Sequence, residues 1–155
     1  MGLDDDIAIL AAAPVFELFE RDALRLLSFA GDRRQLEAGE RLFSRGEPSD
    51  GGYVVMSGLV AVESRRAGEP PVTVGRSGLI GRNALFRAVE RPADAHAVEP
   101  AEVMRLTPSV MSRVLREFPD VAGIVHDGIA AELRDLVQGF SRVGERLKAP
   151  APRGR

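Results

Sequence analysis

The sequence contains no cysteine. This absence excludes disulfides, thiolate zinc sites, iron–sulfur clusters and cysteine nucleophiles from the chain. It agrees with a cytoplasmic location, where structural disulfides are rare. We therefore expect a cytoplasmic protein.

Long apolar runs are also missing, since none approaches the roughly 20 residues of a membrane-spanning helix. The first residues, MGLDDDIAIL, are acidic, whereas a secretory signal begins with basic residues. The sequence also has no large excess of charge of one sign, because its 21 Lys and Arg residues nearly balance its 23 Asp and Glu residues. Without a basic field, direct binding to nucleic acid or to an anionic membrane is not expected.

The sequence also lacks groups of residues with the spacing of a catalytic or metal-binding site. His96 and His126 are the only histidines, and they fall in different predicted elements without metal-ligand spacing. The serines lack a G-x-S-x-G context for a nucleophile. We expect neither a metal site nor an enzyme.

What the sequence does contain is one domain of mainly β structure with flanking helices. Its 155 residues suggest a single domain. Residues 1–30 have helical periodicity, interrupted by APVF at 13–16. From residue 33 to 106, glycines separate short strand-like runs, which predicts a jelly-roll-like β-roll in an α+β fold. These runs are RRQLEA, RLFSRG, GGYVVMSG, LVAVES, PVTVGR, DAHAVEP and AEVMRL.

Two helices are predicted after the β-roll, the last of them long. Thr107 is suited to cap the first helix, and Pro108 to occupy its first turn. The second is expected from about residue 119 to 147. We assign residues 1–147 to the domain, with C-terminal helices over 107–147, and 148–155 to a flexible Pro-rich tail.

The last predicted helix carries a narrow apolar seam. Its spacing of 4, 3, 4, 3 and 4 residues corresponds to almost three heptads. The seam either packs on the β-roll or pairs with a second copy, and we favour a homodimer. Its members are Ile129, Leu133, Leu136, Phe140, Val143 and Leu147.

Three stretches resemble the cyclic nucleotide-binding domain, the sensory part of Crp/Fnr-type regulators and gated channels. They read PVFELFERDALRLL, LEAGERLFSRGEPSDGGYVVMSGLVAVE and GRNALFRAVERPADAHAVEPAEVMRL. The resemblance covers roughly residues 7–147, with glycines 39, 46 and 58 at the family's turns. It implies that an apolar set fills the roll interior, namely Leu42, Phe43, Val54, Val55, Leu59, Val60 and Val62.

The resemblance also places a phosphate-binding cassette, and this cassette is altered. In the family a Gly-Glu pair precedes a short helix, the Glu accepts from the ribose 2′-hydroxyl, and a later Arg pairs with the phosphate. Here the Glu position holds an arginine, which has no acceptor. The residue after the phosphate arginine is a proline without an N–H, followed two residues on by an aspartate. The candidate ligand-binding residues are Gly81, Arg82, Asn83, Ala84, Arg91, Pro92 and Asp94.

Three interpretations of the altered cassette stay open. The pocket is vestigial, with an ion pair between Arg82 and Asp94; or it binds another ligand or a cyclic nucleotide by a different geometry; or ordinary binding of cyclic AMP or cyclic GMP survives. A cyclic nucleotide, cyclic AMP or cyclic GMP, is the candidate ligand, and the sequence indicates no other cofactor.

These features favour a stand-alone regulatory sensor or interaction module, dimeric and acting on a protein partner. The alternative is the isolated sensory domain of a Crp/Fnr-type transcription regulator or an ion channel. No helix-turn-helix segment follows residue 147, and the Met1 start with the Pro-rich end favours a complete small protein.

Overall fold

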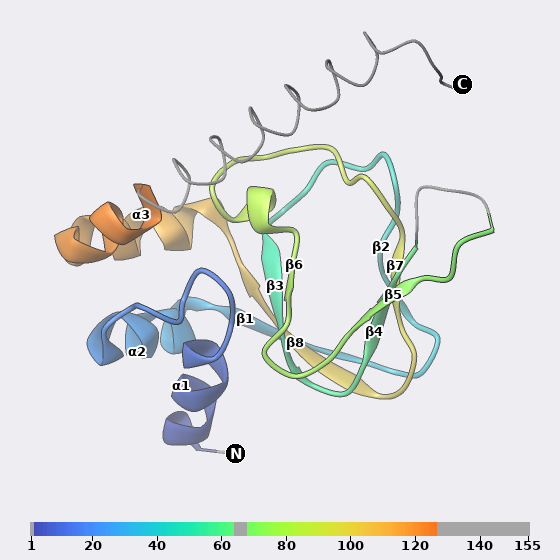
Figure 1. The fold of residues 1–155 in the computed structure, drawn as a ribbon, viewed down its shortest axis with the longest axis horizontal. Coiled ribbons are helices and arrows are strands. Elements are labelled where there is room, and N and C mark those ends of the chain that lie inside the picture. Colours follow the sequence, from blue (N-terminus) through green and yellow to red (C-terminus); the bar gives the residue numbers. More distant parts are fainter. Residues whose placement is uncertain (1, 64–67, 127–155) are drawn as a thin grey trace, which may run out of the picture.

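A computed structural model of the protein describes residues 2–63 and 68–126. Within these residues, eight short strands form a β-roll, and the helices cover one side of it (Figure 1). The helices are α1 (Leu3–Ala11), α2 (Arg21–Ala30) and α3 (Pro108–Glu117), with a one-turn 3₁₀ helix, η1 (Arg82–Leu85). Residues 119–126 are helical as well.

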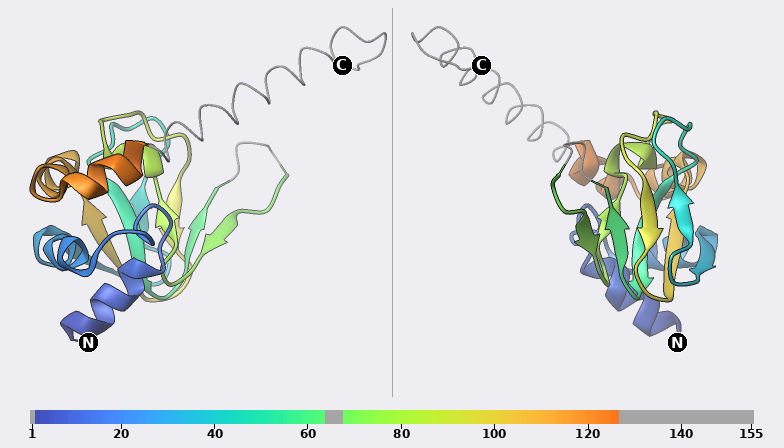
Figure 2. Two further views of the ribbon diagram at one scale, coloured as in Figure 1. Left: turned by 60° about the vertical axis from the view of Figure 1, so that its left-hand side comes forward. Right: turned by 90° about the vertical axis from the view of Figure 1, so that its right-hand side faces the viewer.

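The strands make two antiparallel sheets of four strands each. The first has the order β1-β8-β3-β6 and comprises β1 (Asp32–Leu36), β8 (Ala101–Leu106), β3 (Gly52–Ser57) and β6 (Leu79–Ile80). The second has the order β2-β7-β4-β5 and comprises β2 (Arg41–Phe43), β7 (Ala95–Ala97), β4 (Val60–Val62) and β5 (Val72–Val74). Figure 2 shows the three α-helices gathered on the side of the first sheet that faces away from the second.

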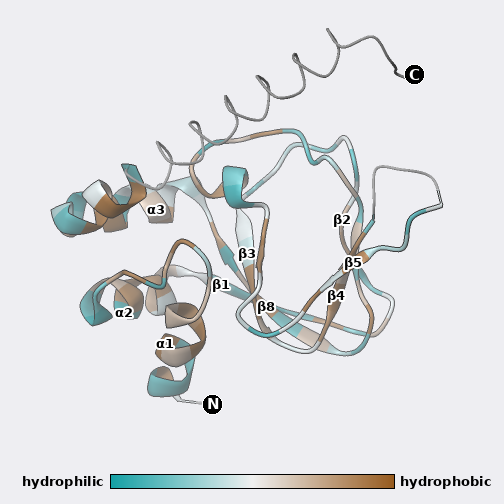
Figure 3. Ribbon diagram, viewed as in Figure 1, coloured by the Kyte–Doolittle hydropathy of each residue, from teal (hydrophilic) through white to brown (hydrophobic). Residues whose placement is uncertain are grey.

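Two apolar clusters follow from this layering, because successive strand residues point to opposite faces of a sheet. In β3, Val54 and Met56 pack against the helices, whereas Tyr53 and Val55 point into the roll. The expectation that Val54 fills the roll interior is therefore wrong, since its neighbour Val55 already occupies that face. Figure 3 shows apolar residues along the strands and on parts of the helices.

The predicted fold class is confirmed by the two sheets with their flanking helices. Seven strand-like runs each contain one strand, and glycines 39, 46 and 58 adopt positive φ angles. Thr107 caps α3 by accepting from the Val110 N–H at 3.2 Å, with Pro108 as the first helical residue. The two-residue strand β6 was not anticipated.

The remaining predictions on the chain ends are not tested. The seam from Ile129 to Leu147 and the tail at 148–155 lie outside the described residues, and the domain limits stay predictions. None of the helices in the described ranges has the length and apolar character that a membrane span needs.

Candidate functional site

Gly81 is the bend between strand β6 and the short helix η1. Its φ of 79° and ψ of 51° lie in the left-handed region, which glycine adopts without steric cost. A Cβ at this position would lie 3.0 Å from Nη1 of Arg91. After this bend Ala84 and Leu85 are buried, while Arg82 and Asn83 are exposed. Glycine thus permits both the turn and the approach of the arginine.

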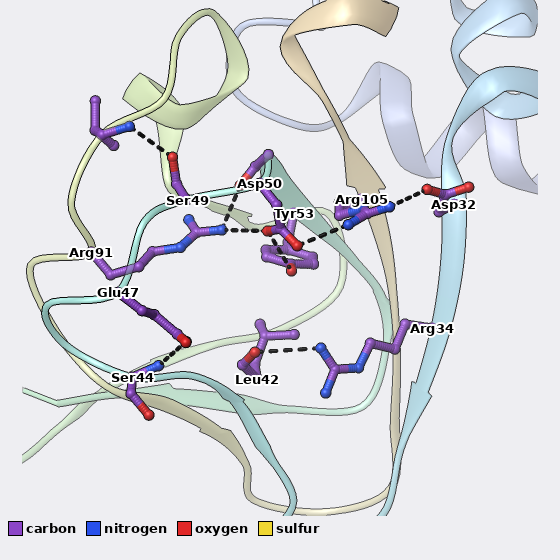
Figure 4. A network of polar contacts seen from close by, with 12 residues as sticks. Asp32, Arg34, Leu42, Ser44, Glu47, Ser49, Asp50, Tyr53, Arg91 and Arg105 are labelled. Atoms are coloured by element: carbon purple, nitrogen blue, oxygen red, sulfur yellow. Dashed lines mark hydrogen bonds and ion pairs between the residues drawn. The ribbon is translucent and has the colours of Figure 1, made fainter.

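Arg91 reaches this bend from the segment before β7, and its side chain is only 2% exposed. Its Nη2 donates to Oδ1 of Asp50 at 3.1 Å and to the carbonyl of Gly51 at 2.8 Å (Figure 4). The guanidinium carbon lies 4.3 Å from the ring centre of Phe43 and 5.5 Å from that of Tyr53. Because arginine remains charged at any pH a protein tolerates, this environment has to hold a cation.

The Arg91 guanidinium is not fully satisfied. Its Nε is buried and has no hydrogen-bond partner among the described residues. A buried donor without a partner costs about 1–3 kcal/mol, so the segment around Arg91 must be stabilised elsewhere.

Backbone pairing with the loop before β3 supplies that stabilisation. The Arg91 N–H donates to the Glu47 carbonyl, and the Gly46 N–H to the Arg91 carbonyl, both at 2.9 Å. Nearby, the Val89 N–H donates to Oγ of Ser49 at 2.8 Å. Pro92 follows at an exposed position, where a proline without an N–H is tolerated.

Asp50 is the centre of an ion-pair chain that starts at Arg91. Its Oδ2 accepts from Nη1 of Arg105 at 2.8 Å, and Nη2 of Arg105 donates to Asp32 at 2.6 Å (Figure 4). The hydroxyl of Tyr53 donates to Oδ1 of Asp50 at 3.3 Å. The chain Arg91–Asp50–Arg105–Asp32 therefore runs from the bend at Gly81 across β3 and β8 to β1.

The pKa shifts of Asp50, Tyr53 and Arg105 agree with these ion pairs and hydrogen bonds. Partial burial acts to raise the pKa of Asp50, but the hydrogen bond from Arg105 and the charges of Arg105 and Arg91 outweigh it and lower the pKa. Burial, followed by the charge of Asp50, raises the pKa of Tyr53. The hydrogen bond to Asp32 is the largest influence raising the pKa of Arg105. Asp50 is thus an ionised acceptor.

Asp94 is held by the segment around β2. Its Oδ1 accepts from the Arg45 N–H at 2.6 Å and lies 3.4 Å from Nη1 of Arg41. The hypothesis that Asp94 is engaged by Arg82 gains no support from these contacts.

Of the seven candidate residues, the structure places the Arg91 guanidinium where a Cβ at Gly81 would crowd it, puts Arg82, Asn83 and Ala84 in η1, and leaves Asp94 beside β2. Sequence reasoning missed the partners of Arg91. No local pattern in the sequence indicates that Asp50 contacts a residue 41 positions away. The described part of the chain has no cluster of three or more His, Cys, Asp or Glu side chains that could hold a metal ion.

Comparisons with known proteins agree with the fold described above. A cyclic nucleotide-binding-like protein of known structure from Brucella abortus is 34% identical, with a TM-score of 0.64, over 73% of this chain and 99% of that one. The N-terminal domain of a transcriptional regulator from Streptomyces coelicolor is 26% identical, with a TM-score of 0.77, over 85% of this chain and 94% of that one.

A curated relative, human patatin-like phospholipase domain-containing protein 6, is 30% identical over 92% of this chain. The chain spans only 9–11% of the length of such curated relatives. The family profile described as "Cyclic nucleotide-binding domain" matches residues 33–118, which is more than half of the sequence. The chain belongs to the cyclic nucleotide-binding domain family.

Proposed function

We propose that the protein is a regulatory module of the cyclic nucleotide-binding fold in which recognition of cyclic AMP and cyclic GMP is altered or lost. One observation carries this proposal: the residue that follows Gly81 and begins η1 is Arg82. The family resemblance assigns this position to a glutamate that accepts from the ribose. An arginine offers donors only, so it leaves the 2′-hydroxyl of a cyclic nucleotide without its acceptor.

The setting of Arg91 supports the same proposal. This arginine matches the family's phosphate ligand, and here it already donates to Asp50 and to the Gly51 carbonyl. The next residue, Pro92, has no N–H to offer a phosphate. The charge of the arginine that would bind the phosphate of a cyclic nucleotide is therefore partly neutralised. The ligand would also lack the ribose acceptor that Arg82 replaces and the N–H that Pro92 lacks.

Isothermal titration calorimetry with cyclic AMP, cyclic GMP and cyclic dinucleotides tests the proposal. We expect no dissociation constant tighter than about 100 μM for either cyclic mononucleotide, because an unmade hydrogen bond to a charged partner costs about 1.5–3 kcal/mol. Micromolar binding of cyclic AMP or cyclic GMP would overturn it. Micromolar binding of a cyclic dinucleotide alone would instead identify a changed ligand.

A regulatory role needs a path from the cassette to the helices, and packing around η1 offers one. Leu85 of η1 is fully buried in the same apolar cluster as Met111 and Val114 of α3. A ligand or partner that shifts η1 would therefore shift α3 and the helix after it. In the family, ligand bound at the short helix moves the C-terminal helices over the roll, and we extend this mechanism to the present chain.

We further propose that the module is a cytoplasmic homodimer, paired through the seam at Ile129–Leu147, and that it acts on a protein partner. We assign it no catalytic role, no nucleic-acid binding and no membrane binding. The similarity to one part of much longer phospholipases is compatible with a regulatory role beside a separate catalytic unit.

A second candidate is the sensory domain of a transcription regulator or ion channel that still binds a cyclic nucleotide. The closeness of the Arg91 guanidinium to the bend at Gly81 supports it, because this arrangement keeps the arginine beside the start of η1. The same calorimetric titration separates the two candidates.

A further inference from the structure

A cavity of about 410 Å³ opens on the first sheet, and two of its lining residues, Asp50 and Tyr53, also contact Arg91 of the predicted cassette. Its lining comes from β1, from the start of β3 and from β8, and comprises Asp32, Arg33, Arg34, Asp50, Tyr53 and Arg105. None of the seven candidate cassette residues belongs to this lining. Its volume falls within the roughly 300–1,000 Å³ of small-molecule sites.

The strand register places most of these side chains on one face. Asp32 and Tyr53 both lie opposite Arg105, and Arg34 lies two residues along β1 from Asp32. Arg34 and Arg105 are therefore diagonal neighbours on the face that looks into the roll, within reach of one small ligand. Arg33 points the other way, where its guanidinium meets Asp6 and Glu102.

The two arginines on this face, Arg34 and Arg105, differ in how closely carboxylates pair with them. Arg105 is held by two carboxylates at 2.6 and 2.8 Å. Among the described residues, Arg34 donates to the carbonyls of Leu42 at 3.4 Å and Arg41 at 3.2 Å, and the carboxylate of Glu40 lies 3.7 Å away. Figure 4 shows Arg34 reaching from β1 toward Leu42, apart from the Arg105 pairs. Arg34 is 43% exposed, so an incoming acid gains most at this guanidinium.

The cavity also offers acceptors. The side chains of Asp32 and Asp50 are 62% and 56% exposed, so each carboxylate can accept from a ligand while it pairs with Arg105. A bare anion placed between the arginines would meet these two carboxylates at close range. A ligand that carries its own donors would turn that repulsion into hydrogen bonds.

We propose that this cavity binds a small acid, a phosphate or a carboxylate, that carries neighbouring hydroxyl groups. The acid group binds Arg34 with help from Arg105, and the hydroxyls donate to Asp32 and Asp50. Since Asp50 is also the counter-ion of Arg91, occupancy of the cavity alters the environment of Arg91. The inference does not depend on the fate of cyclic nucleotide binding.

The test is a titration of the ¹⁵N-labelled full-length chain followed by NMR. Glucose 6-phosphate and gluconate, which each carry one acid group and several neighbouring hydroxyls, are the phosphate and carboxylate probes. Inorganic phosphate and glucose each represent one half of the phosphate probe. At least one acid with hydroxyls should give saturable shifts centred on residues 32–34, 50–53 and 105, and the separate halves should bind at least about tenfold more weakly.

Variants assign the site. Arg34→Gln should weaken binding at least about tenfold, and Arg34→Lys, which keeps the charge but not the planar fork, should weaken it less. Arg113→Gln is the matched control, since Arg113 is an exposed arginine paired with Glu117 on α3. The proposal fails if neither acid gives saturable shifts up to about 10 mM, if shifts centre on residues 81–91, or if Arg34→Gln binds like the unmodified protein.

Discussion

Arg91 carries a permanent charge in a nearly closed setting, between an aspartate, a backbone carbonyl and two aromatic rings. Burial of a charge is costly unless it is paired and hydrogen-bonded. Asp50 supplies the pairing, and Arg105 and Asp32 hold Asp50 in place. The sequence could point to Arg91 through the family's spacing, but not to its partners, because ion pairs between distant segments depend on the folded register.

Asp50→Asn should lower the free energy of unfolding by about 1–2 kcal/mol at pH 7, a modest loss because Asp50 is half-exposed. The lowered pKa of Asp50 means that its carboxylate stabilises the fold above its ordinary pKa. That contribution disappears as the pH falls through the lower value in the folded protein.

The difference between the unmodified protein and Asp50→Asn should therefore shrink below about pH 4 in urea titrations. Glu99→Gln, which changes an exposed carboxylate between β7 and β8, is the control and should show no such trend. A difference that stays constant down to pH 2.5, roughly the lower limit for such titrations, would rule out the ion pair as its source.

Gly81→Ala tests the close approach of Arg91. A non-glycine residue at a left-handed backbone position costs about 1–2 kcal/mol. Gly39→Ala is the matched control, since Gly39 has φ 83° and its added Cβ would meet nothing within 4 Å. Gly81→Ala should lose more unfolding free energy than the control, because its Cβ crowds the Arg91 guanidinium; equal losses would mean that the guanidinium moves aside freely.

At the scale of elements, local signals predicted most of the fold. Glycine-punctuated runs mark seven of the eight strands, and Pro108 after Thr107 marks the start of α3. Strand β6 was not predicted because its two residues are too few to show the alternation of apolar and polar residues that marks a strand. The side on which Val54 lies was predicted wrongly because β3 is buried on both faces, so that consecutive apolar residues such as Val54 and Val55 show no alternation from which to assign its sides.

Thr107→Ala should remove the side-chain cap of α3 and lower the free energy of unfolding by about 1 kcal/mol. Thr107→Ser keeps the hydroxyl that accepts from the Val110 N–H and should lose much less. Denaturant unfolding of both variants measures the difference. If serine and alanine were equally destabilising, the cap would not be the source of the loss.

At the scale of the whole molecule, the heptad seam predicts a dimer. Size-exclusion chromatography with light scattering should give a mass near twice the 16.7 kDa of one chain. The double variant Leu136→Asp, Phe140→Asp should give a monomer, because it places charges in the apolar seam. Gln138→Asp lies off the seam by heptad spacing and should stay dimeric. A monomeric unmodified protein would contradict the prediction.

The family could be predicted because its turns and apolar runs are local features of the sequence. The ligand could not, because Arg82, Pro92 and Asp94 each change a contact whose consequence depends on the three-dimensional surroundings. Asp94 illustrates this, since its carboxylate meets the Arg45 N–H and Arg41.

The most direct test compares the calorimetric affinity for cyclic AMP and cyclic GMP of the unmodified protein and of Arg82→Glu, which returns the ribose acceptor. The account predicts that the unmodified protein binds neither more tightly than about 100 μM, and that Arg82→Glu gains affinity by at least about tenfold, the equivalent of one restored hydrogen bond. Micromolar binding of cyclic AMP or cyclic GMP by the unmodified protein would contradict the claim that the cassette is altered or lost.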